Sequence, residues 1–453
     1  MSTKSNRRQF IKAIGLGAAS LAMPSCLSAA SRNSKKPLAD KPNVILIMAD
    51  DLGYECLGCY GSKSYNTPVL DELAATGVRF EYAYSQPLCT PSRLKIMTGR
   101  YNFRNYTYFG ALPPKEKTFG HMMKQAGYET CIVGKWQLAA RDNGVGTYPE
   151  PAGFDEHCLW QIDDRGSRYR DPIIVQNGKK REDLKDKYGP DIFAEYALEF
   201  IQRKKAAPFF LWFPMALTHA PFEPTPDTEV WKKGITKANK KHFADMVAYM
   251  DKIVGRLVAK LDETNQRENT LIIFTGDNGT PQGITTQMKD GSTIKGGKGE
   301  TTDAGTHVAL IANWKGKIES GKTCSDLVDF SDIVPTIADA ANTSPTWKID
   351  GRSFMPQLYG KQGDPRDWIY IWYRRDPGKP LYRFARDKRW KLYDEGKYPR
   401  AGKLFDVSAD VLEENPIDPA ADNQAKAAHK KLLAVIDSMG PNETGGFEKL
   451  PRK

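Results

Sequence analysis

Short continuous apolar runs recur along the chain. Four of them are NVILIMA (43–49), YETCIVG (128–134), PFFLWFPM (208–215) and TLIIFTG (270–276). Runs of this length without polar alternation are typical of strands that are buried on both faces of a parallel sheet. The sequence therefore predicts that these segments form the centre of one sheet.

Amphipathic segments separate these runs and have the spacing of helices. TPVLDELAATGVRF (67–80) predicts a helix that ends at Gly77, and PSRLKIMTG (91–99) predicts a helix with Pro91 in its first turn, where the missing N–H costs nothing. FGHMMKQAG (119–127) and the long segment 241–263 have the same character. Strands that alternate with helices predict an α/β fold with a large, mostly parallel mixed sheet flanked by helices.

The pattern changes near residue 366. Short aromatic segments with turns between them follow, at 368–376, 381–387, 389–394 and 403–407, and an amphipathic helix is predicted at 423–439. Such segments are typical of a small antiparallel sheet. We therefore expect a main α/β domain over 43–365 and a smaller C-terminal α+β domain over 366–453.

The N-terminus has the pattern of an export signal. A basic start, NRRQFIK (6–12), precedes a small-residue apolar run (13–23) and then SAA (28–30). The paired arginines are similar to the twin-arginine type, which predicts export by that machinery to the periplasm or beyond. Residues 1–30 form the predicted signal and 31–42 a disordered spacer; a basic amphipathic helix and lipidation at Cys26 are the alternatives. The apolar run is short for a bilayer span, and no other run has that character.

Composition limits the chemical class of the binding partner but does not identify it. The formal charge of +11 over 453 residues favours an anionic partner, and no zinc-finger or RNA-binding signature favours nucleic acid. The seven cysteines are scattered too widely for a disulfide framework.

Polar residues follow each of the four apolar runs. They are Asp50 and Asp51, Lys135, His219, and Asp277 with Asn278. Because ligands bind beyond the carboxyl ends of strands in open α/β sheets, we expect these residues to converge. The oxygen donors suit a hard cation such as Ca²⁺ or Mg²⁺. The alternatives are a helix cap and solvated turn at 50–51, a hairpin turn at 276–279, and a structural role for the histidine.

Cys89 stands in SQPLCTPSR (85–93), at the start of a predicted helix and near Arg93. That position lowers a thiol pKa and favours a nucleophilic thiolate. A thiolate would repel an anionic substrate, however, and does not explain an oxygen-type metal site. The chemistry therefore indicates an oxygen nucleophile on a hard cation. Two further segments are candidate anion-binding loops. For 295–305, with Lys298, a flexible surface loop is the default interpretation, and for 163–171 a solvated charge run fits equally.

Together these motifs resemble the sulfatases of the alkaline-phosphatase-like superfamily. CTPSR (89–93) matches the family's C-x-P-S-R signature, and ADDLGYECLGCYG, GKW, TGDNG and GGKG follow the family order. The resemblance implies that a separate maturation enzyme oxidises Cys89 to Cα-formylglycine. The hydrated aldehyde then provides one hydroxyl to attack sulfur and a second to expel sulfate.

The resemblance also assigns roles to individual residues. It implies that Ca²⁺ is bound by Asp50, Asp51, Asp277, Asn278 and the modified Cys89. Arg93 would stabilise formylglycine, Lys135 and Lys298 would hold sulfate oxygens, and His219 would contact the ester oxygen and help to protonate the leaving group. Gln137 replaces the histidine that usually follows GKW and lies in the substrate-binding set, although glutamine cannot shuttle a proton.

The expected function is hydrolysis of sulfate esters, with sulfated carbohydrate as the substrate class. The alternatives are a phosphate or phosphonate ester hydrolase on the same fold, and a catalytically weak protein that binds polyanionic glycans. Retention of Cys89, Pro91 and Arg93 speaks against the binding protein.

Overall fold

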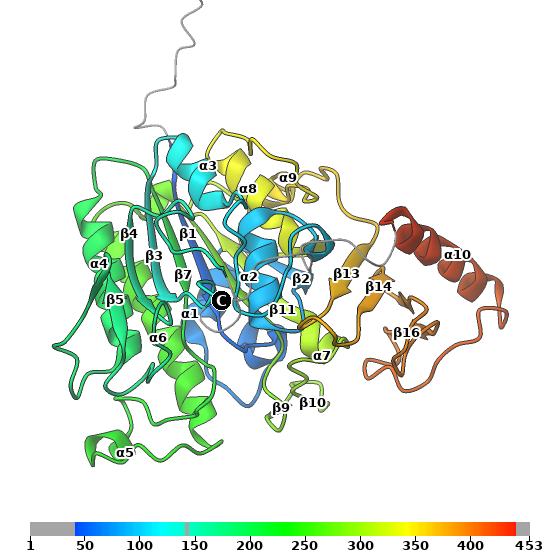
Figure 1. The fold of residues 1–453 in the computed structure, drawn as a ribbon, viewed down its shortest axis with the longest axis horizontal. Coiled ribbons are helices and arrows are strands. Elements are labelled where there is room, and N and C mark those ends of the chain that lie inside the picture. The colour runs from blue at the N-terminus through cyan, green and yellow to red at the C-terminus, as the bar shows by residue number, and fades with distance from the viewer. Residues whose placement is uncertain (1–40, 141–144, 441–453) are drawn as a thin grey trace, which may run out of the picture. The chain divides into compact units, whose positions relative to one another are not determined.

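A ten-stranded mixed sheet organises the chain in the computed structural model, which describes residues 41–140 and 145–440. Its order is β12-β2-β11-β8-β1-β7-β3-β4-β5-β6 (Figure 1). Five adjacent strands at its centre run parallel: β8 (Thr270–Gly276), β1 (Asn43–Ala49), β7 (Phe209–Pro214), β3 (Glu129–Lys135) and β4 (Glu156–Trp160). The four apolar runs therefore form strands at the centre of the sheet, as predicted.

The outer strands make the sheet mixed. On one side β11 (His307–Asn313) pairs antiparallel with both β8 and β2 (Val78–Tyr84), and β12 (Lys322–Asp329) pairs parallel with β2. On the other side β5 (Ile174–Gln176) and β6 (Lys179–Lys180) add antiparallel pairs. The predicted fold class is confirmed.

Helices cover both faces of the sheet, which explains why the central strands are apolar throughout. Val44, Leu46 and Met48 share one core with α2 (Cys89–Thr98), α3 (Phe119–Gln125) and α8 (Ile333–Ala340). Ile45 and Ile47 point to the other core, with α1 (Pro68–Ala75), α4 (Gly189–Arg203) and α6 (His242–Glu263). Successive residues of a strand point to opposite faces, so both sets are buried.

A four-stranded antiparallel sheet follows near the C-terminus. It contains β13 (Ile369–Tyr373), β14 (Tyr382–Arg386), β15 (Trp390–Tyr393) and β16 (Leu404–Asp406), and α10 (Asn423–Ser438) packs on it (Figure 1). The predicted antiparallel sheet and terminal helix are confirmed. The domain boundary near residue 366 stays a prediction.

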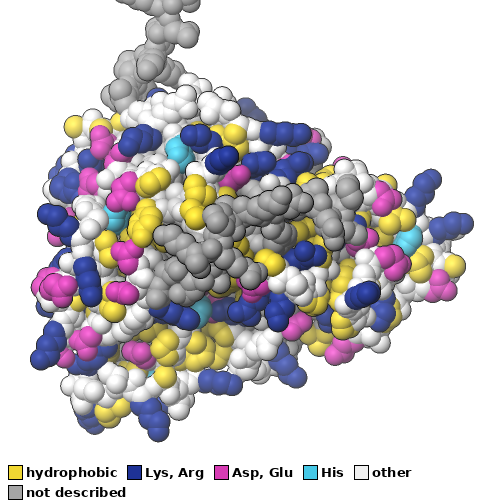
Figure 2. Space-filling model, in the orientation of Figure 1, with side chains coloured by type: hydrophobic (Ala, Val, Ile, Leu, Met, Phe, Trp, Pro, Cys, Tyr) yellow, Lys and Arg dark blue, Asp and Glu magenta, His cyan; other side chains and the backbone are white. Residues whose placement is uncertain are grey.

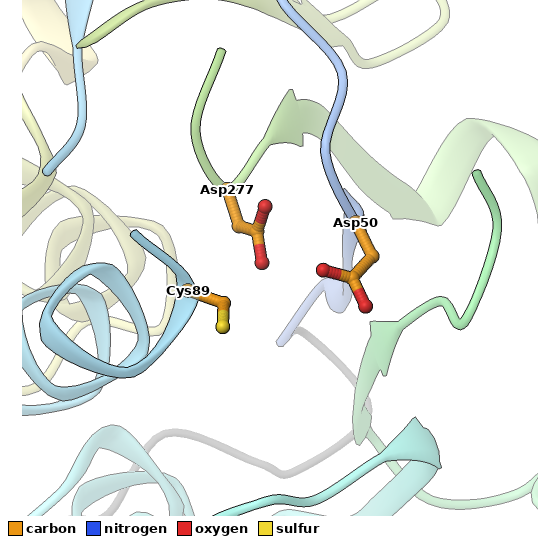
Figure 3. A group of neighbouring side chains, drawn as sticks. All are labelled: Asp50, Cys89 and Asp277. Atoms are coloured by element: carbon orange, nitrogen blue, oxygen red, sulfur yellow. The ribbon is translucent and has the colours of Figure 1, made fainter. Parts of the chain in front are cut away.

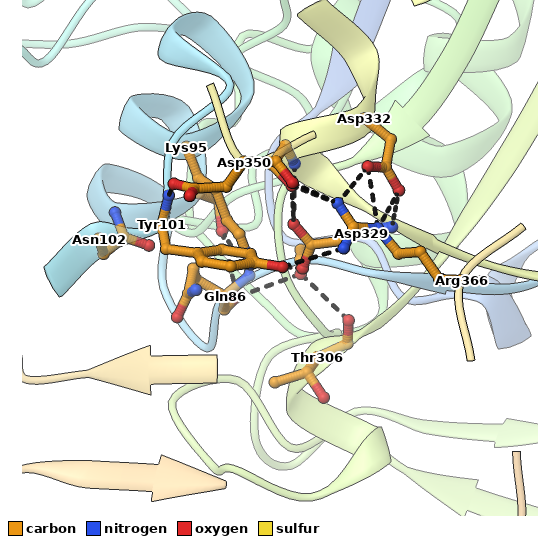
Figure 4. Close-up of polar contacts among 12 residues, drawn as sticks. Gln86, Lys95, Tyr101, Asn102, Thr306, Asp329, Asp332, Asp350 and Arg366 are labelled. Carbon is orange, nitrogen blue, oxygen red and sulfur yellow. Dashed lines mark hydrogen bonds and ion pairs between the residues drawn. The ribbon is translucent and has the colours of Figure 1, made fainter. Parts of the chain in front are cut away.

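Arg366 ties the start of this C-terminal region to the main sheet. Its guanidinium forms a buried bidentate pair with Asp332 and donates to the Tyr101 hydroxyl, 2.9 Å away (Figure 4). The same network contains the buried ion pair between Lys95 of α2 and Asp329, at 2.5 Å. A buried ion pair therefore holds helix α2 in place through Lys95, and all ten residues of the helix are buried.

The remaining elements are short. They are α5 (Glu229–Lys232), α7 (Asp303–Thr306), α9 (Met355–Leu358), β9 (Thr285–Gln287), β10 (Thr293–Lys295) and the 3-10 turns Tyr54–Cys56, Gly58–Tyr60, Asn102–Arg104, Arg267–Asn269 and Phe330–Asp332. No helix in the described ranges is both long and apolar enough to cross a membrane. The predicted export signal, Cys26 and all but the last two residues of the predicted spacer lie outside the described residues.

Candidate active site

The carboxyl ends of β1 and β8 bring two acidic residues together. Ala49 and Gly276 end these strands and are paired in register, so Asp50 and Asp277 begin the two adjacent loops. Their carboxylates and the Cys89 thiol face one another (Figure 3), and one ligand atom from each lies within 4.8 Å of the others. Residues that are far apart in the sequence therefore meet at one edge of the sheet, as the strand-end pattern predicts.

The oxygen atoms of this cluster fit a hard cation. Asp51 has a left-handed backbone with a φ of 63°, and its Oδ1 accepts from the Asn278 Nδ2 at 2.9 Å, so the Asn278 Oδ1 is the amide atom left free. Among the described residues, the Asn278 Oδ1 and the Asp50 Oδ1 are buried without a hydrogen-bond partner. Buried acceptors of this kind are costly unless a donor or a cation satisfies them. Carboxylate and amide oxygens are the ligands that Ca²⁺ prefers.

The pKa shifts of the two aspartates also indicate that the cluster needs a bound cation. Burial alone would raise the pKa of Asp50, but Lys135 and other nearby cations hold it well below its usual range. Burial, with the Asp50 carboxylate beside it, raises the pKa of Asp277 well above its usual value. The protein's own cations therefore do not allow both acids to ionise easily, whereas a divalent cation between them would.

Two lysines stand against the aspartates. The Lys135 Nζ is buried and lies 2.7 Å from the Asp50 Oδ2, and the Lys298 Nζ lies 2.5 Å from the Asp51 Oδ2. Burial would lower the pKa of Lys298, but the Asp51 carboxylate and its neighbours raise it above the usual value. Lys298 is therefore charged at neutral pH, and 21% of its side chain is exposed, which opens the cluster to solvent on this side.

His219 adds a neutral ring to the cluster. Its Nδ1–H donates to the Ala220 carbonyl at 2.6 Å, and its Nε2 lies 3.6 Å from the Asp51 Oδ2. Burial lowers the pKa of His219 to about 4, although the Asp51 carboxylate opposes that shift. At neutral pH the free nitrogen, Nε2, therefore faces the aspartate without a proton.

Cys89 is placed by the first turn of α2. It is the first residue of the helix, follows extended Leu88 and is 2% exposed. The Ser92 hydroxyl donates to the Leu88 carbonyl at 2.9 Å and accepts from the Gln86 N–H at 3.0 Å, which fixes the approach to the helix. Arg93, four residues on, donates from NH1 to the Lys135 carbonyl at 2.9 Å and from NH2 to Asp277 at 3.4 Å.

Gln137 lies on the turn that follows Lys135. Its φ of 66° is left-handed, and its N–H donates to the Gln161 carbonyl at 3.1 Å. The side-chain Oε1 is buried and, among the described residues, has no hydrogen-bond partner. The unpartnered atom is therefore an acceptor, which a donor would satisfy.

One cation of the site was not singled out by the sequence. Arg168 lies in the segment 163–171, is 5% exposed, and reaches within 3.9 Å of the Asp50 Oδ2. Arg165 and Arg170 carry the same charge in the same segment, so no signal in the sequence marks Arg168 among them.

Comparison with known families decides the class of protein. The family model described as Sulfatase matches residues 42–343. The chain belongs to the sulfatase family. A second model, described as the C-terminal part of N-sulphoglucosamine sulphohydrolase, matches residues 301–438. The reaction of this sulfatase is the hydrolysis of a sulfuric ester, as its sequence motifs predict.

Individual relatives cover most of this sulfatase. The N-acetylgalactosamine-6-sulfatase of Canis lupus familiaris is 31% identical, over 81% of this chain and 72% of its own length. The arylsulfatase of Hemicentrotus pulcherrimus is 32% identical, over 76% of this chain and 66% of its own. A crystal structure of Ps i-CgsB in complex with k-i-k-neocarrahexaose superposes with a TM-score of 0.73 and 26% identity, over 88% of this chain and 93% of that one.

Proposed function

We propose that this sulfatase removes sulfate from sulfated carbohydrates, with Ca²⁺ bound at the strand ends and Cα-formylglycine formed at Cys89. The observation that carries the proposal is the buried cluster itself. The Asp50 and Asp277 carboxylates lie beside the first residue of α2, and Asp51 lies beside Asp50. The Asn278 Oδ1 is buried without a partner among the described residues, and Lys135 and Lys298 pair with the aspartates. This arrangement suits an anionic substrate and an oxygen nucleophile.

The proposed metal ligands are Asp50, Asp51, Asp277, Asn278 and residue 89. When bound, Ca²⁺ would supply positive charge that polarises a sulfate oxygen and favours an ionised nucleophile. Formylglycine would supply an oxygen nucleophile with a second hydroxyl for sulfate release. Arg93 supports both parts, because its guanidinium contacts Asp277 and fixes the carbonyl of Lys135.

Lys135 and Lys298 would bind the sulfate group. Each ammonium has three donors and spends one on its aspartate, so two remain for sulfate oxygens. Charged donors placed where negative charge develops stabilise a transition state strongly in a site that excludes water. Gln137, on the adjacent turn, would donate from its Nε2 amide, the only donor in that side chain.

His219, once Nε2 is protonated, would donate to the ester oxygen and then protonate the leaving alcohol. The carbonyl of Ala220 fixes the ring through Nδ1, which leaves Nε2 as the atom that faces the substrate. Because the free ring is neutral, Nε2 has to take up a proton before it can donate one to a leaving alcohol. The anionic substrate itself favours that protonation.

The proposed substrate class has two supports. The relatives include an N-acetylgalactosamine-6-sulfatase, and the superposed crystal structure holds a neocarrahexaose. The chain also carries a formal charge of +11, which favours approach of polyanions. Lys and Arg side chains are spread over the described part of the face seen in Figure 2, with acidic side chains between them. Recognition of the reacting sulfate therefore rests on the buried cations rather than on that general excess.

Export and maturation complete the proposal. The basic start with paired arginines, the apolar run and SAA support export by the twin-arginine machinery to the periplasm or beyond. The CTPSR stretch supports recognition of Cys89 by a formylglycine-generating enzyme.

Release of inorganic sulfate tests the function directly. The full chain, produced together with a maturation system, is incubated with sulfated mono-, oligo- and polysaccharides and with an aryl sulfate, and mass spectrometry verifies conversion of residue 89. We expect release by the converted wild type, and a loss of at least about 10³-fold for Cys89→Ala, because the nucleophile is gone. Converted enzyme that releases no sulfate from any carbohydrate of the panel would contradict the proposed substrate class.

A further inference from the structure

Arg168 is a buried cation that the proposed metal and sulfate sites leave without a role. Its side chain is 6% exposed, and its NH1 is buried without a hydrogen-bond partner among the described residues. Among the residues that the structure describes, the acidic group within ion-pair range is Asp50, whose Oδ2 lies 3.9 Å from NH1. That oxygen already accepts from the Lys135 Nζ at 2.7 Å. Arg168 therefore lies near the cluster but forms no hydrogen bond with Asp50.

The Trp160 ring fixes the position of the Arg168 guanidinium. The guanidinium stacks on this ring, with the Cζ 3.9 Å from the ring centroid, and Trp160 is itself 1% exposed. Trp160 is paired in register with Lys135 across β3 and β4. The stacked guanidinium therefore lies beside the strand end that carries Lys135. A planar cation stacked on an aromatic ring directs its N–H groups parallel to the plane of that ring.

The backbone of this segment is fixed as well. The Tyr169 hydroxyl donates to the carbonyls of Ala216 and His219, at 3.0 and 2.5 Å. The Gly189 N–H donates to the Tyr169 carbonyl at 2.8 Å, and a Cβ at position 189 would come within 2.1 Å of the Arg168 carbonyl oxygen. Arg168 is therefore held by the same contacts that tie its segment to the loop of His219.

A buried guanidinium N–H without a partner is costly. The Arg170 NH1 is also buried without a partner among the described residues, but Arg170 pairs with an acid through its NH2, whereas Arg168 has no acid within hydrogen-bond distance there. Arg165 is exposed, and Arg170 stacks on Trp231 at 4.6 Å and pairs with Asp186 at 3.2 Å. Arg168 alone of these three is buried against the cluster. The missing partner of its NH1 has to be an acceptor, and an anionic oxygen would satisfy both its charge and its hydrogen-bonding geometry.

We propose that Arg168 is a substrate-binding residue that donates from NH1 to an anionic oxygen of the bound substrate. The inference rests on the proposed sulfatase site. The position beside Lys135 and Asp50 favours the reacting sulfate as the source of that oxygen. A second acidic group on the carbohydrate presents the same chemistry, and the experiment separates these two sources.

The first arm measures binding of inorganic sulfate, which has no second acidic group and undergoes no turnover. Calorimetry on the Ca²⁺-loaded full chain compares wild type with Arg168→Gln, Arg168→Lys and the matched control Arg170→Gln. We expect Arg168→Gln to weaken sulfate binding about 10- to 100-fold, which is the effect of losing a charged hydrogen bond. The sulfate affinity of Arg168→Lys should lie between those of Arg168→Gln and wild type, because lysine keeps the charge but lacks the planar N–H donors of the guanidinium. The control should stay within about twofold, since Arg170 has its own acidic partner.

The second arm measures KM for an aryl sulfate and for a carbohydrate with two acidic groups. A similar rise in KM on both substrates assigns the contact to the reacting sulfate. A rise on the second substrate alone, with sulfate binding unchanged, assigns it to the other acidic group. Unchanged sulfate binding and unchanged KM on both substrates, in variants that unfold at the wild-type temperature, would overturn the proposal. A wild type without activity would contradict the proposed function instead, and the sulfate-binding comparison would still stand.

Discussion

At the scale of single residues, His219 shows how the fold determines which ring nitrogen carries a proton. The ring is fixed by the Ala220 carbonyl and is neutral, because burial lowers its pKa to about 4. A neutral ring that donates from Nδ1 is ready to accept at Nε2 and has to be charged before it acts as an acid. Its contribution should therefore depend on how much the departing alcohol needs a proton.

His219→Ala tests this dependence. Sugar alcohols are poor leaving groups, so we expect kcat on a carbohydrate sulfate to fall about 10²- to 10⁴-fold, the usual value of general acid catalysis. An aryl sulfate leaves as a stabilised phenolate, and its kcat should fall by about tenfold or less. Steady-state kinetics on both substrates measures the difference, and equal losses would mean that His219 only binds.

Most of the site residues follow from one rule that is visible in the sequence. Asp50, Lys135 and Asp277 each end or follow a buried strand, and parallel strands present their carboxyl ends at one edge. Arg168 does not follow from that rule. Its burial depends on the tertiary contact with Trp160, and Arg170 offers the same chemistry two residues away.

At the scale of elements, the C-terminal sheet supports the loop that carries Lys298. Arg386 of β14 forms a buried ion pair with Asp303, the first residue of α7. From β15, the Lys391 Nζ donates to the Thr301 carbonyl at 2.5 Å, and the Tyr393 hydroxyl, which donates to Glu413, accepts from the Thr301 Oγ1 at 3.0 Å. The C-terminal region therefore contributes to the site by positioning a loop of the main sheet.

Arg386→Met tests this support. Loss of the guanidinium leaves Asp303 buried without its main partner, which typically costs about 3–5 kcal/mol. We expect a lower urea midpoint and a rise in KM, because Lys298 loses its fixed position while the reacting groups stay in place. Arg389→Met is the matched control, since Arg389 lies in the turn between β14 and β15 but is 48% exposed in its pair with Asp406.

The pair can also be removed as a unit. Asp303→Asn combined with Arg386→Met takes away the unpaired charge and should recover part of the stability, while KM stays high. A KM equal to that of wild type in the destabilised single variant would show that the loop keeps its place without this pair.

The local pattern predicts most of the elements to within a few residues, because both core faces demand apolar strands and amphipathic helices. It does not predict the direction of β11. HVALIAN (307–313) is fully buried, like the parallel strands, yet β11 runs antiparallel to β8 and β2. Burial on both faces determines composition, whereas direction depends on the path of the connection. Between β8 and β11 the chain forms the β9–β10 pair and the short helix α7, and no long helix that crosses back over the sheet.

At the scale of the whole molecule, the acidic cluster links activity to stability. Asp50, Asp51 and Asp277 are fully or almost fully buried, and the opposed pKa shifts of Asp50 and Asp277 show that the protein's own cations do not satisfy both acids. A Ca²⁺ ion that binds only the folded chain would stabilise it by about 2.7 kcal/mol at a free concentration of 100 Kd. Chelation should therefore remove turnover and lower the unfolding temperature together, and added Ca²⁺ should restore both.

Two variants show whether the cluster is responsible for this link. Asp277→Asn removes one proposed ligand charge, so the unfolding temperature should lose most of its rise with added Ca²⁺. Asp290→Asn removes an exposed carboxylate outside the cluster and should keep the full rise. Differential scanning calorimetry over a Ca²⁺ series measures both. Full activity after exhaustive chelation, or the same Ca²⁺-dependent rise in both variants, would contradict the assignment, because the buried acids would then be balanced without the ion.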